Sequence, residues 1–146
     1  MHAFEETKII PCQAKDFFDI VLDISAYPDF LPWVSRASVL SRTEHALTAE
    51  LVASLAGKEY SFQTTDTFEK HAHIDIRLLN GPFKFLESFW SFENLGEHSC
   101  RVHFSIEFAF NSRMLDLIAA PIFSVACKSM VHSFEKRVQA IHGKLC

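Results

Sequence analysis

The residues that could do acid–base chemistry are few and isolated in this sequence. Glu87 lies between Leu86 and Phe89, and burial among such neighbours would raise the pKa of its carboxyl. We favour the alternative, a strand residue that faces solvent or pairs with a Lys or Arg, because charged side chains are seldom buried. We therefore assign Glu87 no catalytic role.

The histidines and cysteines form no arrangement that suggests a reactive centre. His71 and His73 would share one face of a strand, but no third ligand is evident nearby to complete a metal site. Cys127 has no predictable base beside it and is expected in the core. The sequence contains neither the GxSxG turn of a hydrolase nor a glycine-rich phosphate loop. We predict no catalytic residues, no metal and no catalytic cofactor.

The composition indicates an unusually aromatic interior. Among 146 residues there are fifteen phenylalanines but two tyrosines and two tryptophans, which supplies much apolar area with few polar atoms. The net charge is −4 and the basic residues are scattered, so we expect no binding to DNA. The four cysteines lack CxxC spacing, and we find no signal peptide and no stretch long enough to span a bilayer. We expect a single cytoplasmic domain over residues 1–146.

Hydrophobic periodicity predicts the order of the elements. Residues 4–10 can form a strand, and residues 14–24 an amphipathic helix. From residue 33 onward the period changes to two, with alternating apolar and polar residues over 47–55, 60–69, 72–78 and 102–110, and residues 83–95 form a further strand that is apolar on both faces in places. Short turns such as Asn80-Gly81-Pro82 join these segments. This succession indicates an antiparallel meander with one apolar face.

A long helix is predicted at the C-terminus. Asn111 and Ser112 offer N-caps, and Pro121 should kink the helix or divide it in two. Apolar residues recur at helical spacing, namely Leu115, Ile118, Ile122, Ala126, Met130, Phe134, Val138 and Ile141. Because an apolar sheet face must be covered, we predict an α+β fold in which a curved antiparallel sheet of six to seven strands wraps around this helix.

The wrapped sheet leaves space for a ligand. The small side chains of Ala49 and Ala53 leave room beneath the helix, which is where a pocket for a small hydrophobic molecule is expected. For any single Phe, ordinary core packing is the favoured alternative. The candidate cavity residues are Tyr27, Phe30, Leu31, Trp33, Leu51, Tyr60, Phe62, Phe68, Ile76, Phe104, Phe108, Ile118, Ile122 and Met130.

Three stretches carry a family resemblance: YPDFLPW over residues 27–33, GPFKFLESFWSF over 81–92 and VHFSIEFAF over 102–110. The order of elements is similar to the helix-grip fold of the START-like superfamily, which also contains polyketide cyclases. Over residues 4–143 the chain resembles the coenzyme Q-binding protein family, whose bacterial members include the ribosome association toxin. The resemblance implies binding of ubiquinone or a similar isoprenoid lipid by a carrier or chaperone that supports respiratory electron transfer. For the toxin members it implies binding to the large ribosomal subunit and a block of subunit joining.

Two surface features bear on these alternatives. Residues 27–33 would lie over the open end of the sheet, either as a lid or lip in transient contact with the inner membrane surface, or as a rigid turn with its aromatics folded inward. The last helix carries Lys128, Lys136, Arg137 and Lys144, which could meet the large ribosomal subunit or simply face solvent. A third hypothesis, a cyclase-type enzyme that uses the cavity, lacks a positioned acid or base.

Overall fold

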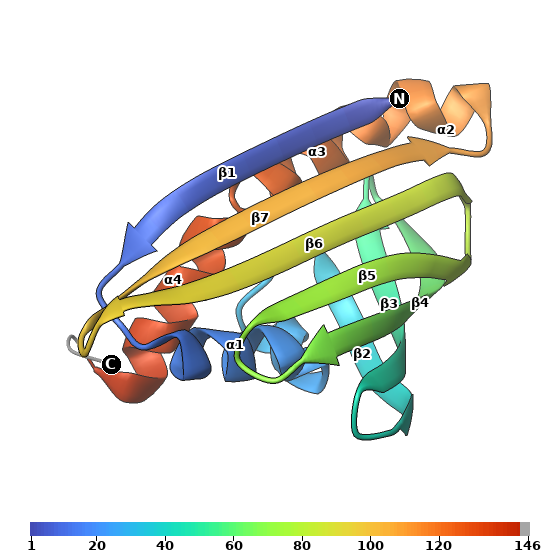
Figure 1. Ribbon diagram of the computed structural model, residues 1–146. Coiled ribbons are helices and arrows are strands. Elements are labelled where there is room, and N and C mark those ends of the chain that lie inside the picture. Colours follow the sequence, from blue (N-terminus) through green and yellow to red (C-terminus); the bar gives the residue numbers. More distant parts are fainter. Residues whose placement is uncertain (144–146) are drawn as a thin grey trace.

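The computed structural model describes residues 1–143, in which a seven-stranded antiparallel sheet wraps around a layer of helices (Figure 1). The strands lie in the order β1-β7-β6-β5-β4-β3-β2, so that β1 is the one strand paired with a partner distant in the sequence. The α+β class predicted from the sequence is confirmed. The strands are β1 (His2–Ile10), β2 (Val34–Arg42), β3 (Ala46–Leu55), β4 (Lys58–Glu69), β5 (His73–Asn80), β6 (Phe83–Gly96) and β7 (Ser99–Phe110).

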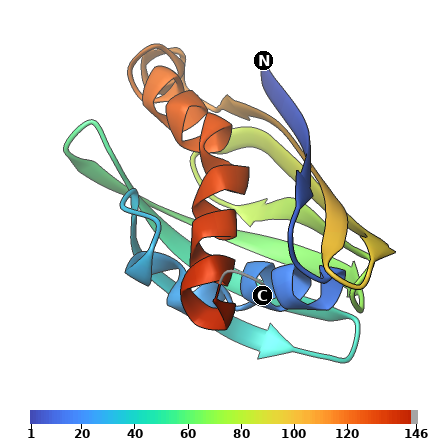
Figure 2. The ribbon, with the colours of Figure 1, turned by 90° about the vertical axis from the view of Figure 1, so that its left-hand side faces the viewer.

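The helices cover the concave face of the sheet. They are α1 (Ala14–Leu22), the 3-10 helix η1 (Ile24–Asp29), α2 (Arg113–Ile118), α3 (Ala120–Lys128) and α4 (Met130–His142). Figure 2 shows α3 and α4 crossing the inside of the sheet in one line, with α1 beside the end of α4. None of the helices within residues 1–143 is both long enough and apolar enough to cross a membrane.

Alternating burial orients the strands as the sequence predicts. On β7 the even-numbered residues are all buried beneath the helices, because successive side chains of a strand point to opposite faces. On β6 a register shift lies between Phe83 and Phe85, after which Leu86 and Trp90 face inward. Phe89 points to the outer face, where it is half-buried. The apolar residues of β6 therefore lie on two surfaces, the concave face beneath the helices and the outer face of the sheet.

The C-terminal helix is divided near Pro121, as predicted, but some of the residues predicted to face the sheet do not. It is divided at Ala119 and again at Ser129. Pro121 lies in the first turn of α3, where its missing N–H leaves no hydrogen bond unmade. Ala119 keeps right-handed helical backbone angles, and its N–H and C=O make helical hydrogen bonds to Leu115 and from Phe123, so the helical phase continues through it. The side that packs on the sheet carries Ala119, Ala120 and Phe123. Ile118, Ile122 and Ile141, predicted to face inward, are 51%, 40% and 50% exposed.

One ring joins the helical layer to the sheet. Phe134 of α4 is 1% exposed and packs edge-on against Trp90 of β6, with the ring centroids 5.3 Å apart. Its ring also lies 5.3 Å from Tyr27 of η1 and 6.5 Å from Phe17 of α1. Edge-to-face aromatic contacts of this kind stabilise beyond the area they bury. Phe134 thereby fixes α1, η1 and α4 relative to β6.

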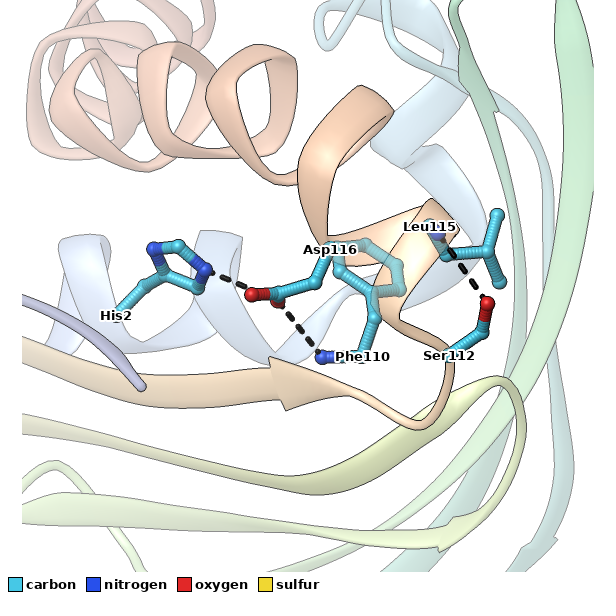
Figure 3. A network of polar contacts seen from close by, with 5 residues as sticks. All are labelled: His2, Phe110, Ser112, Leu115 and Asp116. Atoms are coloured by element: carbon cyan, nitrogen blue, oxygen red, sulfur yellow. Dashed lines mark hydrogen bonds and ion pairs between the residues drawn. The ribbon is translucent and has the colours of Figure 1, made fainter.

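A small polar network ties α2 to the sheet edge (Figure 3). Oδ1 of Asp116 accepts a hydrogen bond from the backbone N–H of Phe110 at 3.2 Å and lies 3.0 Å from Nε2 of His2. The Phe110 hydrogen bond, with a smaller effect from His2, lowers the pKa of the Asp116 carboxyl. Ser112 caps α2 by accepting from the N–H of Leu115. The ends of β1 and β7 and the start of α2 are thus held together.

The turn between β5 and β6 needs a glycine. Gly81 has a φ of +149°, and a Cβ on it would lie 2.5 Å from Cβ of Phe62 on β4. We expect Gly81→Ala to lower the free energy of unfolding by about 1–3 kcal/mol, as overpacking does, measured by urea denaturation. Gly96→Ala is the matched control, since its Cβ would meet nothing within 4 Å. Equal stability of the two variants would contradict this account of the turn.

Candidate functional site

A narrow apolar cavity lies between the sheet and the helices. Its volume is about 80 Å³, well below the roughly 300–1,000 Å³ of typical small-molecule sites. Seventeen residues from η1, the segment after it, β3 to β7, α3 and α4 line it. They are Ile24, Tyr27, Leu31, Trp33, Leu51, Phe62, Thr64, Asp66, Ile76, Leu86, Ser88, Trp90, Phe104, Ile106, Phe123, Met130 and Phe134.

Eight of the fourteen predicted cavity residues lie in this wall: Tyr27, Leu31, Trp33, Leu51, Phe62, Ile76, Phe104 and Met130. The structure does not bring the other six to the cavity. Phe68 and Phe108 are core residues packed against Phe18 and Phe83, respectively. Phe30 packs against Phe134 behind the wall, and Tyr60 is half-buried on β4. Ile118 and Ile122 face away because the side of the helix that packs on the sheet is the one that carries Ala119, Ala120 and Phe123.

Residues 27–33 form part of the wall itself. The predicted turn is η1 followed by a short connection. Its aromatic side chains fold inward, which agrees with the alternative of a rigid turn. The Tyr27 hydroxyl donates a hydrogen bond to the carbonyl oxygen of Val21. Trp33 packs edge-on against Phe123 of α3, with the ring centroids 5.5 Å apart. Arg137 of α4 lies 5.2 Å above the Phe30 ring and holds this segment from outside.

Three buried polar residues of the wall were missed by the sequence analysis. Thr64, Asp66 and Ser88 are 2%, 3% and 7% exposed, and no other polar or charged residue among positions 1–143 is buried to this extent. Thr64 and Asp66 continue the inward-facing positions of Phe62 and Phe68 along β4. The even numbering that Asp66 shares with the apolar residues of β4 could have revealed its position, because alternate residues of a strand face the same side.

Burial changes the acidity of this site. It raises the pKa of the Asp66 carboxyl to about 6, although a hydrogen bond from Oγ1 of Thr64, at 2.8 Å, opposes the rise. Burial also raises the pKa of Tyr27 well above its usual value, with smaller contributions from the charges of Asp66 and Asp23. The cavity therefore holds a carboxyl that titrates near neutral pH beside a phenol that stays neutral.

Asp66 also weakens one argument made from the sequence. The enzyme hypothesis was set aside because no acid or base could be named in the cavity, and Asp66 is such a group. The wall described here also contains Tyr27, whose hydroxyl donates to the carbonyl oxygen of Val21, but no second carboxyl and no histidine. A single carboxyl of this kind suits recognition of a polar group on a ligand.

A larger hollow of about 630 Å³ opens on the outer face of the sheet. Its floor includes Glu5, Asp75, Glu87 and Glu107, and Glu87 is exposed and pairs with Arg77 at 3.1 Å. The solvent-facing alternative for Glu87 is therefore confirmed. We place the candidate site in the inner cavity, because its mostly apolar wall can desolvate a hydrophobic ligand and the charged surface of the outer hollow cannot.

The remaining candidates of the sequence analysis lie apart from the cavity. His73 stacks on Phe89 of the outer face and lies 3.3 Å from Glu69, whereas His71 is 3.9 Å from Asp19. Cys127, Cys12 and Cys100 are all buried. Burial raises the pKa of Cys127 to about 12, which keeps the thiol protonated and unreactive. Lys144 and Cys146 lie outside the described residues.

The fold and cavity correspond to a known family. Residues 10–135 match the family described as polyketide cyclase / dehydrase and lipid transport, and the chain belongs to this family. The Ribosome association toxin RatA of Pseudomonas aeruginosa is 32% identical over 139 residues, which are 95% of this chain and 96% of the toxin. Coenzyme Q-binding protein COQ10 homolog B, mitochondrial, of Xenopus laevis is 26% identical over 97% of this chain and 59% of its own length.

Solved structures show the same architecture. The 18 kDa protein CC1736 from Caulobacter crescentus is 35% identical, with a TM-score of 0.76 over 98% of this chain and 99% of its own. The aromatase/cyclase ZhuI from Streptomyces sp. R1128 has a TM-score of 0.69 at 16% identity, over 97% of this chain and 88% of its own. The second likeness shows the shared fold alone. The resemblance to the coenzyme Q-binding and ribosome association toxin proteins is confirmed by the named relatives.

Asp66 should make the stability of the protein depend on pH. The folded pKa of about 6 exceeds the ordinary 3.8, so the folded state binds more protons and the free energy of unfolding falls as pH rises from about 4 to about 6. Two pKa units correspond to about 3 kcal/mol. We expect Asp66→Asn to remove this fall and to raise the unfolding free energy at pH 8 by about 1–3 kcal/mol, measured by urea denaturation at each pH.

Asp75→Asn on the neighbouring strand β5 is the matched control, because Asp75 faces the outer hollow and pairs with Arg77 at 3.4 Å. This variant should keep the pH profile of the wild type. Parallel profiles for the wild type and Asp66→Asn between pH 4 and 8 would show that Asp66 does not titrate as its burial requires.

Proposed function

We propose that this protein binds ubiquinone or a similar isoprenoid lipid in the inner cavity without transforming it, and supports respiratory electron transfer as a carrier or chaperone. The observation that carries the proposal is the enclosed wall of aromatic and aliphatic side chains that also contains Asp66. A quinone ring can stack on Trp33, Phe104 or another ring of this wall. The name of the Xenopus laevis relative supports the same ligand.

The size of the cavity sets a condition on this function. At about 80 Å³ it is smaller than a quinone headgroup with its first isoprenoid unit requires. The wall must therefore move outward on binding. Residues 27–33 suit this movement, because they lie outside the strands and, among the backbone hydrogen bonds described, reach a strand beyond the adjoining β2 only at Trp33, whose carbonyl oxygen accepts from the N–H of Ser54 at 2.7 Å. From outside they are held to α4 by Arg137, 3.7 Å from Asp29. A surface ion pair of this kind is weak.

The outer side of α2 and α3 supports exchange of such a ligand with a membrane. Large apolar side chains are exposed there, and Arg113 and Lys128 lie at the two ends of the run. Apolar residues flanked by cations suit the headgroup layer of an anionic membrane. Phe123 on the inner side of α3 lines the cavity, so one helix would face both the ligand and the bilayer. The exposed residues are Met114, Leu117, Ile118, Ile122 and Val125.

Mass spectrometry of an organic extract tests the binding proposal. The protein is purified from a quinone-making bacterium, together with Ile76→Trp, which fills the cavity, and Leu79→Trp, a control on the exposed side of the same strand. We expect a stoichiometric quinone from the wild type and from Leu79→Trp, and roughly tenfold less from Ile76→Trp, equivalent to about 1.4 kcal/mol of binding energy. Extracts without quinone from all three proteins would contradict the proposal.

A second candidate function, association with the large ribosomal subunit and a block of subunit joining, is favoured by the Pseudomonas aeruginosa relative. That protein is named a ribosome association toxin and matches 95% of this chain. Lys128 of α3 and Lys136 of α4 are exposed on the outer side of the helices. Cations at this surface would meet ribosomal RNA phosphates, a contact that weakens as salt rises.

Co-sedimentation with isolated large subunits tests this second function. We expect Lys128→Glu/Lys136→Glu to lose binding by roughly tenfold or more at low salt, because each reversal replaces an attraction with a repulsion. Lys58→Glu/Lys84→Glu is the control with the same change of charge on exposed strand residues. Wild-type protein that stays in the supernatant at low salt would count against ribosome association, and equal loss by both variants would count against this surface.

A further inference from the structure

Asp66 is a buried carboxylate that the fold does not use. It is 3% exposed, and the one hydrogen bond that its side chain accepts from residues 1–143 comes from Thr64, two residues away on the same face of β4. Among residues 1–143 no Lys, Arg or His forms an ion pair with it. An unpaired buried carboxyl destabilises a protein, so its presence in the cavity wall indicates a role in binding.

The hydroxyl groups in the wall around Asp66 already donate their hydrogen atoms to other protein groups. Thr64 donates to Asp66, Ser88 donates to the carbonyl oxygen of Ser105 at 3.1 Å, and Tyr27 donates to Val21. What these hydroxyls still offer a ligand is oxygen lone pairs. The other polar atoms of the wall are the indole N–H groups of Trp33 and Trp90. The polar side of the cavity is therefore rich in acceptors.

The cavity wall, as far as the structure describes it, contains one ionisable group besides Asp66. Tyr27 of η1 faces the same cavity, and its pKa is raised, so it stays neutral. Asp23, before η1, acts on Tyr27 from outside the wall. The wall residues described on β3, β5, β6, β7, α3 and α4 include no Asp, Glu, His, Lys or Arg. A pH effect on cavity binding near neutral pH would therefore report Asp66.

We propose that Asp66 holds the polar headgroup of the cavity ligand by a hydrogen bond and selects the hydroquinone over the quinone at neutral pH. This inference rests on the proposed quinone binding. An ionised carboxyl can only accept, so it binds the hydroxyl of a hydroquinone; a protonated carboxyl can donate to the carbonyl of a quinone. Hydrogen bonds to an ionised group are the stronger kind.

The protonation of Asp66 sets the pH at which this preference changes. With a pKa of about 6, the carboxyl is mostly ionised at pH 7 and above and mostly protonated below pH 6. When a quinone binds at neutral pH, the Asp66 carboxyl must take up a proton, so the affinity for the quinone falls as pH rises. A hydroquinone needs the ionised form, and its affinity is kept or raised over the same range.

The test is a titration with decylubiquinone and with its hydroquinone under argon, from pH 5.5 to 8. The fluorescence of Trp33 and Trp90, the two tryptophans of the chain, reports binding because both line the cavity. For the wild type we expect quinone affinity to fall by roughly 10- to 50-fold between pH 6 and 8, and hydroquinone affinity not to fall. Asp66→Asn should bind both with no pH dependence, and Asp75→Asn should behave as the wild type.

Thr64→Val provides a test that leaves the carboxyl in place. Loss of the Thr64 hydroxyl removes the hydrogen bond that lowers the Asp66 pKa. The pH at the midpoint of the fall in quinone affinity should therefore move to a higher value. Quinone affinity that is flat from pH 5.5 to 8 in the wild type, or equally steep in Asp66→Asn, overturns the role of Asp66 while quinone binding stands. Failure of both probes to bind any of the proteins overturns the proposed function and this inference together.

Discussion

The apolar concave face of one curved sheet is the constraint on which the rest of this structure depends. Seven strands present buried residues to the same side, and water must be kept from all of them. Phe134 meets this need at the centre, where its ring contacts those of Trp90, Tyr27 and Phe17. Helices that approach from the ends of the chain are thereby held against strands from its middle, and the space that they do not fill is the cavity.

The cavity combines two properties that oppose each other energetically. Its walls are mostly apolar, which favours a hydrophobic ligand, and they contain a carboxyl that loses hydration on folding. Thr64 offsets only part of that loss. A ligand that supplies the missing hydrogen bond would stabilise the folded protein more than its apolar area alone predicts. The carboxyl therefore links the stability of the empty protein to what it binds.

The two candidate functions use different parts of the molecule. Ligand binding depends on the inner side of α3 and α4, where Phe123 and Met130 meet the sheet. The proposed contact with a ribosome or a membrane would use the outer side of the same helices, where Lys128 and Val125 are exposed. Movement of the wall on binding would shift helices that carry both surfaces. The two roles are thus physically compatible within one chain.

The sequence by itself determined the fold class, because alternation along a strand and the three-to-four spacing of a helix are local properties of the backbone. It also located eight cavity residues, since Leu51, Phe62 and Phe104 follow directly from that alternation. Only the tertiary structure decided that Ile118 and Ile122 face outward, because the sheet packs on the adjacent side of the helix, which carries Ala119 and Phe123, and apolar spacing alone does not distinguish the two sides. Only it placed Asp66 under Tyr27, whose approach from η1 depends on contacts across the whole chain.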